Sequence, residues 1–448
     1  MSVDFGRIIR VTQGKAGENT EKNRVFDLFT TDSREVDGDG ALFVAFKGER
    51  ADAHHYLDSV LSKGKNGALI EDPAFLKANT VLVPSSRTAL QQIARDYREN
   101  EIKDTLCIGI TGSVGKTTAK EMTVKCLSSG KTVSFTKGNR NSQVGLPRTV
   151  LEVPEGTECA VFEMGMSLPG EMERIAVCAQ PDIIMVINIG TSHIEAFGTR
   201  EKIRDEKLTI LKGLRKGGKL IVNGDEPLLA SIPEAIKCGI DNEQNQVYAY
   251  NIKKGTDSTS FDVCLFGEHF STRIGAIGTH MVYDALFAFA AGHLAGLTVE
   301  QMRTSLEDFS SVGDRQRIVE KDGVRIIADC YNASPESVCA ALEVLSGFSG
   351  RKIAVLGDML ELGDHSPSLH SGVGKRAAEK NVDILVCIGE QSKNAAVSFG
   401  GKAVCFNADE GEKAAEYIKN TVSAGDTVLF KGSRGMHLET IMKKVFEI

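Results

Sequence analysis

Short apolar runs that read as strands alternate with amphipathic helical patterns from residue 105 to the end of the chain. The helical patterns fill the intervals, as at 116–127, 368–381 and 410–422. Such alternation predicts βαβ units and largely parallel sheets, whereas the less regular stretch 240–275 predicts antiparallel strands added to the central sheet. The strand-like runs lie at 105–110, 159–163, 183–189, 219–222, 324–328, 352–356, 383–388 and 427–430.

The length of the chain, 448 residues, exceeds the roughly 250–300 residues that one hydrophobic core supports. Two breaks divide it. The polar segment 99–101 precedes the first strand of the alternating region, and the segment 310–314 reads SSVGD. We therefore predict three domains, at 1–103, 104–312 and 313–448, each of ordinary domain size.

A formal net charge of −7 argues against a dedicated nucleic-acid binder, which would present a strongly basic face. No apolar run approaches the roughly 20 residues of a membrane span, and charged residues near the N-terminus leave no signal-peptide core. The 10 cysteines form no C-x-x-C pair and mostly lie in apolar runs. We expect a cytoplasmic protein with reduced, buried thiols and no structural zinc site.

The segment 109–118, which reads GITGSVGKTT, joins a predicted strand to a predicted helix. Consecutive backbone amides in such a loop bind phosphates, and the helix N-terminus adds a favourable dipole. Lys116 would then reach the terminal phosphates, and the Thr117 hydroxyl would bind Mg²⁺. The match to G-x-x-x-x-G-K-T is incomplete because residue 110 is isoleucine, so an ordinary strand-to-helix turn is the alternative.

Polar side chains stand where the predicted parallel strands end, which is the edge where ligands gather in α/β sheets. Such positions are occupied by Glu163, His193, Asp329 and Lys431. Taken singly, each has an ordinary explanation as a cap, a solvated loop residue or a hydrogen-bonded histidine. However, Thr117, Glu163 and His193 follow three strands of one predicted sheet, which predicts an Mg²⁺–nucleotide site there.

Lys207 lies on the apolar stripe of a predicted helix at 200–214, together with Ile203, Ile210 and Leu211. A lysine rarely faces a protein core unless it is paired. The pattern alone therefore favours a lysine that lies at the edge of the stripe and extends its amine to solvent.

These motifs converge on one family: the chain resembles the Mur ligases, and within them the dipeptide-adding branch, along essentially its full length. The loop alone is modestly specific, whereas the blocks together, in order and at matching spacing, are highly specific. The blocks are TDSR at 31–34, LFVAFKGER at 42–50, the loop at 111–118, GNRN at 138–141, VGLP at 144–147, EMG at 163–165, GE at 170–171, NIGTSH at 188–193 followed by Lys207, DCYNASP at 329–335, GDMLELG at 357–363 and KGSR at 431–434.

The resemblance implies an α/β fold of three domains. A small N-terminal α/β domain would bind a UDP-linked substrate, and a central domain with a parallel sheet and a phosphate loop would bind ATP. A C-terminal Rossmann-like domain would bind the incoming dipeptide.

The resemblance also implies a nucleotide and metal site. Thr117 and Glu163 would bind one Mg²⁺, while His193 and a carbamylated Lys207 would bind a second. The interval of 14 residues from His193 to Lys207 matches the family, and carbamylation by CO₂ would turn a buried amine into an anionic ligand. With Lys116, the residues Glu163, His193 and Lys207 would form the catalytic set. The implied ATP contacts are Gly112, Ser113, Val114, Gly115, Lys116, Thr117, Thr118, Asn141, Arg315 and Asp329, the last of these on the ribose.

The implied reaction is the ATP-dependent formation of an amide bond between UDP-N-acetylmuramoyl-tripeptide and D-alanyl-D-alanine in peptidoglycan precursor synthesis. It would run through an acyl phosphate, in a monomer that neither binds nucleic acid nor inserts stably into membranes. The uridine-diphosphate end of the substrate would meet Ser33, Arg34 and Lys47, and further substrate contacts in the C-terminal domain would come from Lys431, Ser433 and Arg434.

The chain departs from the family pattern in two places. The block 278–284 reads GTHMVYD where the family usually reads G-x-H-N-x-x-N, so Met281 and Asp284 replace two amides near the expected adenine site. Ala53 replaces a usual glycine near the substrate pocket.

Three alternative functions stay open. A sibling Mur ligase would add a different amino acid, but the C-terminal region carries no Asp-Asn-Pro-Arg block. A folylpolyglutamate synthase shares the central fold but fits the N-terminal domain poorly. A non-catalytic nucleotide-binding protein would not need the intact set of Lys116, Glu163, His193 and Lys207.

Overall fold

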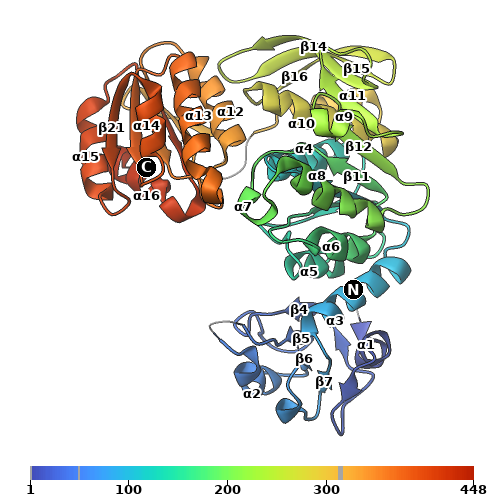
Figure 1. The fold of residues 1–448 in the computed structure, drawn as a ribbon. Coiled ribbons are helices and arrows are strands. Elements are labelled where there is room, and N and C mark those ends of the chain that lie inside the picture. The colour runs from blue at the N-terminus through green and yellow to red at the C-terminus, as the bar shows by residue number, and fades with distance from the viewer. Residues whose placement is uncertain (1–2, 49–50, 311–315, 448) are drawn as a thin grey trace. The chain divides into compact units, whose positions relative to one another are not determined.

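A computed structural model describes residues 3–48, 51–310 and 316–447 of the chain (Figure 1). The chain divides into two compact units, which are described separately below. The first contains Met1–Thr111, Gly130–Met185 and Glu206–Leu220, and the second contains Gly112–Ser129, Val186–Asp205 and Ile221–Ile448. Within the described residues, no helix combines the length and the apolar character that crossing a membrane requires.

The N-terminal part of the first unit is a five-stranded sheet in the order β2-β7-β6-β5-β4. All neighbouring pairs are parallel except β2 with β7. Phe43, Ala45, Ala68 and Ile70 lie in the core that this sheet forms with α2 (Leu57–Leu61). The strands are β2 (Lys15–Ala16), β4 (Leu28–Thr30), β5 (Ala41–Val44), β6 (Gly67–Ile70) and β7 (Thr80–Leu82).

The rest of the first unit begins with α3 (Ser86–Asn100), which leads into β8 (Leu106–Thr111). Strand β10 (Cys159–Glu163) is parallel both to β8 and to β9 (Val133–Phe135). Further elements of this part are α5 (Gly145–Leu151), α6 (Glu171–Ala179) and β11 (Ile183–Val186). The central sheet has nine strands in the order β16-β15-β14-β13-β12-β11-β8-β10-β9.

The second unit contains the other end of this sheet. Strands β12, β13 and β14 are parallel, and β14, β15 and β16 are antiparallel, which confirms the expectation for 240–275. Helix α4 (Lys116–Leu127) packs against α10 (Thr279–Leu294). The strands are β12 (Lys219–Asn223), β13 (Ile236–Ile240), β14 (Val247–Lys254), β15 (Thr259–Leu265) and β16 (Glu268–Ile274).

The C-terminal sheet has the order β17-β18-β22-β19-β20-β21, and only β17 (Arg317–Lys321) is antiparallel to its neighbour. Helices α15 and α16 cover one face and α12, α13 and α14 cover the other, as in a doubly wound fold (Figure 1). The remaining elements are β18 (Val324–Asp329), β19 (Lys352–Gly357), β20 (Ile384–Ile388), β21 (Lys402–Phe406), β22 (Thr427–Lys431), α12 (Pro335–Ser346), α13 (Ser366–Glu379), α14 (Lys393–Phe399), α15 (Gly411–Thr421) and α16 (Leu438–Phe446).

The α/β prediction is confirmed, with two corrections to element bounds. The expected helix at 200–214 ends as α8 (Arg200–Leu208), and the chain continues as a 3-10 helix, Thr209–Gly213. The expected strand at 183–189 ends at Val186, because Asn188 turns its backbone and side chain to the phosphate loop instead. All ten cysteines are free thiols and most are buried, as expected, although Cys405 is exposed.

Candidate active site

The phosphate loop is held in place by one asparagine. The Asn188 Oδ1 atom accepts hydrogen bonds from the backbone amides of Ser113 and Val114, each at 2.9 Å, and Asn188 Nδ2 donates to the Val114 carbonyl at 2.8 Å. Gly115 has a φ of 83°, a left-handed conformation that favours glycine, and α4 begins after it without a side-chain cap. The N-cap residue Gly115 has no side chain to cap α4, and a helix N-terminus of this kind is suited to an anion.

Lys116 folds back over this loop. Its Nζ donates to the carbonyls of Gly112 at 2.7 Å and Ser113 at 3.4 Å. The ammonium group therefore lies over the loop and not in bulk solvent. In this position it would meet the terminal phosphate of a nucleotide bound to the loop. Thr117 and Thr118 follow in the first turn of α4.

Glu163 ends β10 and is only 3% exposed. The Asn141 Nδ2 atom donates to Glu163 Oε1 at 2.8 Å, and the Glu163 amide donates to Thr136 Oγ1 at 3.0 Å. The expected nucleotide contact Asn141 and the expected metal ligand Glu163 are thus direct partners. A buried carboxylate oriented by an amide is a suitable hard ligand for Mg²⁺.

His193 occupies a left-handed turn, with φ 64°, just before the short helix α7 (Ile194–Phe197). Its Nδ1 lies 2.5 Å from Glu361 Oε2, and this contact with His193 lowers the pKa of the Glu361 carboxyl. Glu361 belongs to the GDMLELG block, in the segment that follows β19. A histidine whose Nδ1 is engaged by a carboxylate presents Nε2 to a metal ion, which is the usual arrangement at metal sites.

Lys207 is 2% exposed, so the interpretation of a snorkelling lysine at the edge of the stripe is wrong. Lys207 is buried on the same side of the chain as Ile203 and Ile210, the apolar positions one turn before and after it. Burial of an ammonium group is costly, which favours either a charge partner or neutralisation. The burial of Lys207 is compatible with a carbamate at this position.

Thr117 and His193 belong to the second unit, while Glu163 and Lys207 belong to the first. Among the described residues, no three His, Cys, Asp or Glu side chains gather as a metal ion would require. The expected set contains only two residues of these types, because its other members are a threonine hydroxyl and a lysine carbamate. Assembly of the four ligands around metal ions stays a prediction.

In the C-terminal sheet, Asp329 and Lys431 face each other across β18 and β22. Lys431 Nζ donates to Asp329 Oδ2 at 2.6 Å and to the Asn332 carbonyl at 3.1 Å. The expected ribose contact and an expected substrate contact therefore form one ion pair at the carboxyl edge of the sheet. Ser433 is buried, and its hydroxyl accepts a hydrogen bond from the Leu360 amide, whereas Arg434 extends beside the Tyr331 ring.

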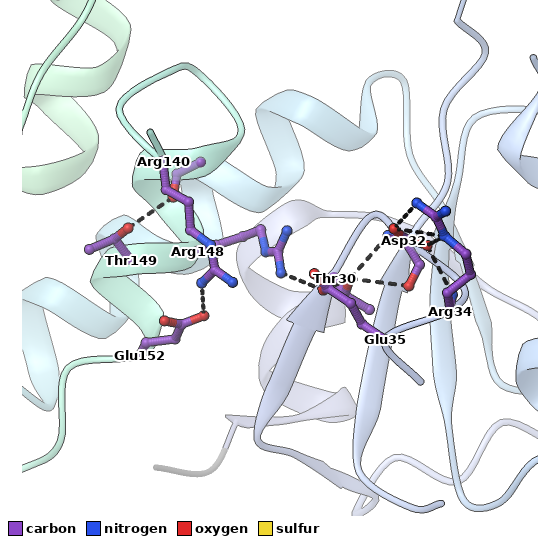
Figure 2. A network of polar contacts seen from close by, with 9 residues as sticks. Thr30, Asp32, Arg34, Glu35, Arg140, Arg148, Thr149 and Glu152 are labelled. Atoms are coloured by element: carbon purple, nitrogen blue, oxygen red, sulfur yellow. Dashed lines mark hydrogen bonds and ion pairs between the residues drawn. The ribbon is translucent and has the colours of Figure 1, made fainter. Parts of the chain in front are cut away.

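The loop at 31–34 is the exposed end of the expected substrate site. The Arg34 side chain is 88% exposed, and its Nε and Nη2 atoms donate to the two Asp32 carboxylate oxygens at 2.8 and 2.6 Å (Figure 2). These bonds from Arg34 lower the pKa of the Asp32 carboxyl to about 2. Lys47 is also exposed, and Ser33 lies beside Arg34 in the same loop.

Two of the departures from the family pattern, Met281 and Asp284, lie in α10, whereas Ala53 begins the 3-10 helix Ala53–Tyr56. Asp284 and Met281 are both buried, and burial raises the pKa of the Asp284 carboxyl well above its usual value. A Cβ added to Gly115 would lie 3.7 Å from an Asp284 oxygen, which places this carboxyl beside the phosphate loop. Arg315, the remaining expected nucleotide contact, lies outside the described residues.

Sequence reasoning did not assign roles to Asn188, Glu361 and Glu336. The Glu336 Oε1 atom accepts a hydrogen bond from the Thr191 amide at 2.7 Å, in the loop that ends at His193. Asn188 and Glu361 stand inside motif blocks, which is a signal that could have singled them out. Glu336 directly follows such a block, and only the folded chain shows what it contacts.

Comparisons with known proteins agree with this architecture. Residues 110–292 match the family model of the Mur ligase middle domain, and residues 314–434 match that of the Mur ligase glutamate ligase domain. A UDP-N-acetylmuramoyl-tripeptide–D-alanyl-D-alanine ligase of Bacillus subtilis is 36% identical, over 98% of this chain and 97% of its own. The chain therefore belongs to the Mur ligase family.

Solved structures support the same conclusion. MurF from Acinetobacter baumannii superposes with a TM-score of 0.93 at 30% identity, covering 100% of this chain and 99% of that chain. The MurF ligase from Thermotoga maritima in complex with ADP has a TM-score of 0.85 at 30% identity, covering 94% and 97%. The protein has the α/β Mur ligase fold.

Proposed function

We propose that the protein joins UDP-N-acetylmuramoyl-tripeptide to D-alanyl-D-alanine through an amide bond, with ATP converted to ADP and phosphate. The observation that carries this proposal is the phosphate loop, whose amides are held by Asn188 at the uncapped start of α4. The loop lies in a chain similar over its whole length to proteins that bear this ligase name. The nucleotide-linked substrate places the enzyme in the cytoplasm, where it acts as a monomer.

The chemistry begins with attack of the tripeptide carboxylate on the γ-phosphate of ATP, which gives an acyl phosphate and ADP. The dipeptide amine then attacks the acyl carbon, and phosphate leaves. Both steps bring anionic groups together, so fixed positive charge stabilises their transition states. Lys116, already positioned over the loop by the Gly112 carbonyl, supplies part of that charge.

Metal ions fit the donor set. Thr117 and Glu163 would hold one Mg²⁺, and His193 and carbamylated Lys207 would hold a second. When bound, such ions neutralise phosphate charge and orient the transferred group. The buried Glu163 carboxylate oriented by Asn141, the Nδ1 of His193 engaged by Glu361, and the deeply buried Lys207 support this assignment.

The site geometry is compatible with the remaining proposed substrate contacts. Arg34 and Lys47 are exposed cations suited to the diphosphate, with Ser33 beside them. Lys431 and Arg434 stand at the carboxyl edge of the C-terminal sheet, where the incoming dipeptide would bind next to Ser433. The third residue of the substrate peptide is left open.

The test is phosphate release by the purified protein with ATP, Mg²⁺, UDP-N-acetylmuramoyl-tripeptide and D-alanyl-D-alanine, with each component omitted in turn. Release that requires both substrates, together with a pentapeptide product detected by mass spectrometry, is the expected result. Release that ignores the dipeptide would point to a sibling ligase with another amine. Absence of release with any muramoyl peptide would refute the proposal.

A further inference from the structure

Glu35 directly follows the expected substrate loop and is the meeting point of two hydrogen bonds. Its Oε2 atom accepts from Thr30 Oγ1 at 2.5 Å and from Arg148 Nη2 at 2.6 Å (Figure 2). The Thr30 bond is the largest influence on the Glu35 carboxyl and lowers its pKa, burial opposes this, and the Arg148 charge lowers the pKa further. Glu35 is therefore an anion held between its own loop and α5.

The Thr30–Glu35 bond closes the loop on itself. The Asp32 amide donates to Thr30 Oγ1 at 3.0 Å, and the Glu35 amide donates to the Asp32 carbonyl at 3.1 Å. The residues between, Ser33 and Arg34, are those expected to meet the uridine diphosphate. A change in the Glu35 side chain would thus loosen the backbone that presents both of them.

The Arg148 side chain is buried at its ion pair with Glu35. Arg148 lies on α5, its side chain is only 10% exposed, and its Nε atom is buried without a hydrogen-bond partner among the described residues. Removal of one member of a buried ion pair leaves the other charge uncompensated, which costs far more than loss of a surface pair. Because the Glu35 side chain is 40% exposed, the cost here lies between these limits.

Helix α5 is in turn joined to the segment that carries Asn141. Arg140 Nη1 pairs with Glu152 Oε1 at 2.5 Å, which ties that segment to the C-terminal end of α5 (Figure 2). A Cβ added to Gly145 would lie 2.6 Å from the Arg140 Cα atom, so the segment packs closely on the first turn of α5. Asn141 then donates to Glu163, the expected metal ligand.

We propose that the Glu35–Arg148 ion pair is a positioning device for a nucleoside-diphosphate substrate. It anchors the loop 31–34 to α5 and so sets the position of the diphosphate relative to the Asn141–Glu163 pair. Neither residue touches the substrate; both act through the loop. The inference rests on the proposed function only for the identity of the full substrate, since it requires a uridine-diphosphate group and not a particular peptide.

The experiment uses the full chain with Glu35→Gln, Arg148→Met, Arg148→Lys and the double variant Glu35→Gln/Arg148→Met. We expect each neutralising single variant to raise the KM for the UDP-linked tripeptide roughly tenfold, with kcat and the KM values for ATP and dipeptide within about twofold. The double variant should be little worse than either single one, because both remove the same interaction. Arg148→Lys should recover part of the loss.

The matched control is Asp96→Asn. It removes the similarly buried Arg7–Asp96 ion pair, which makes no contact with Glu35 or Arg148, while Arg7 keeps its pair with Glu101. Thermal unfolding of every variant separates a general loss of stability from a local effect. Equal changes in all three KM values, additive single effects, or the same KM change in Asp96→Asn would overturn the proposal.

A binding measurement keeps this inference separate from the proposed function. Calorimetry with uridine diphosphate alone should show weaker binding to Glu35→Gln and Arg148→Met than to the unmodified chain and Asp96→Asn. If the chain fails to ligate but this difference appears, the proposed function is wrong and the positioning role holds. If the chain ligates normally and uridine diphosphate binds all variants alike, the positioning role is wrong.

Discussion

In the proposed function, the phosphate loop and the loop at 31–34 each meet a phosphate-bearing ligand, but they do so through different chemical groups. The phosphate loop offers backbone amides, held by the neutral side chain of Asn188 and opened by the left-handed Gly115. The 31–34 loop offers exposed side-chain charge, and it is held by the anion of Glu35 and the cation of Arg148. Binding through backbone amides depends on the geometry of the loop, whereas binding through exposed side chains depends on their charge and on screening by solvent.

The largest effect on activity should come from loss of Lys116, the cation at the phosphate loop. Lys116→Met should lower kcat by roughly 10²–10³-fold, because it removes a fixed charge from the transition state. The KM for the UDP-linked tripeptide should change little, since in the proposed function that ligand meets the loop at 31–34. Steady-state kinetics check this, with thermal unfolding to confirm that the variant is folded, and a loss below tenfold would contradict it.

Asn188→Ala should have the next largest effect. It removes the side-chain bonds to the Ser113 and Val114 amides and to the Val114 carbonyl, three hydrogen bonds of about 1 kcal/mol each, while the Ser113 amide keeps its bond to the backbone carbonyl of residue 188. We expect the KM for ATP to rise roughly 10–100-fold while the KM for the tripeptide substrate stays nearly constant. Asn245→Ala, which removes a buried amide in the same unit, is the control. An unchanged ATP affinity would show that the loop holds its shape without Asn188.

Arg34→Ala tests the other loop. The KM for the UDP-linked tripeptide should rise about tenfold, which is typical for loss of one charge-assisted contact. Because the Arg34 side chain is exposed, salt should screen this interaction, so 0.5 M KCl should narrow the gap between the variant and the unmodified chain. The effect of Asn188→Ala should be nearly independent of salt. If salt changed the effects of Arg34→Ala and Asn188→Ala equally, the contrast between a charge-dependent loop and a geometry-dependent loop would be wrong.

The smallest expected effect is on protein stability, and it comes from Asp284, which lies beside Gly115. Its carboxyl has a pKa well above the usual 3.8 because burial disfavours the charge, so the folded chain holds a proton that the unfolded chain releases. Stability is therefore lost as pH rises from about 3.8 through the raised value. Asp284→Asn removes this dependence and should stabilise the protein by about 1 kcal/mol at pH 8.

Urea unfolding at pH 5 and pH 8 checks this prediction. The advantage of Asp284→Asn should be larger at pH 8 than at pH 5. An advantage that is equal at both values, or larger at pH 5, would show that Asp284 is already ionised in the folded chain. The same variant restores an amide that the family usually carries at this position.

The sequence was sufficient to predict the class of fold and most strand and helix positions. The predicted bounds of β10 and α4 match the structure because β10 is a short buried run next to polar residues, and Gly115 and Ser128 flank α4. Two predicted bounds were wrong, and for one of them, the strand, a tertiary contact is the reason. The strand expected at 183–189 stops at Val186 because Asn188 serves the phosphate loop, and the helix expected at 200–214 ends at Leu208.

The sequence by itself determined which reactive and binding groups the protein has. These are a glycine-rich loop before a helix, a lysine and a threonine directly after the loop, and polar residues at strand ends. The sequence also placed Lys207 on an apolar stripe, but only the tertiary structure decided that this amine is buried. The pairs Asn141–Glu163, His193–Glu361 and Glu35–Arg148 likewise join residues distant along the chain. Local patterns report the period and the ends of elements, whereas such pairs depend on how sheets and helices pack, which no local pattern encodes.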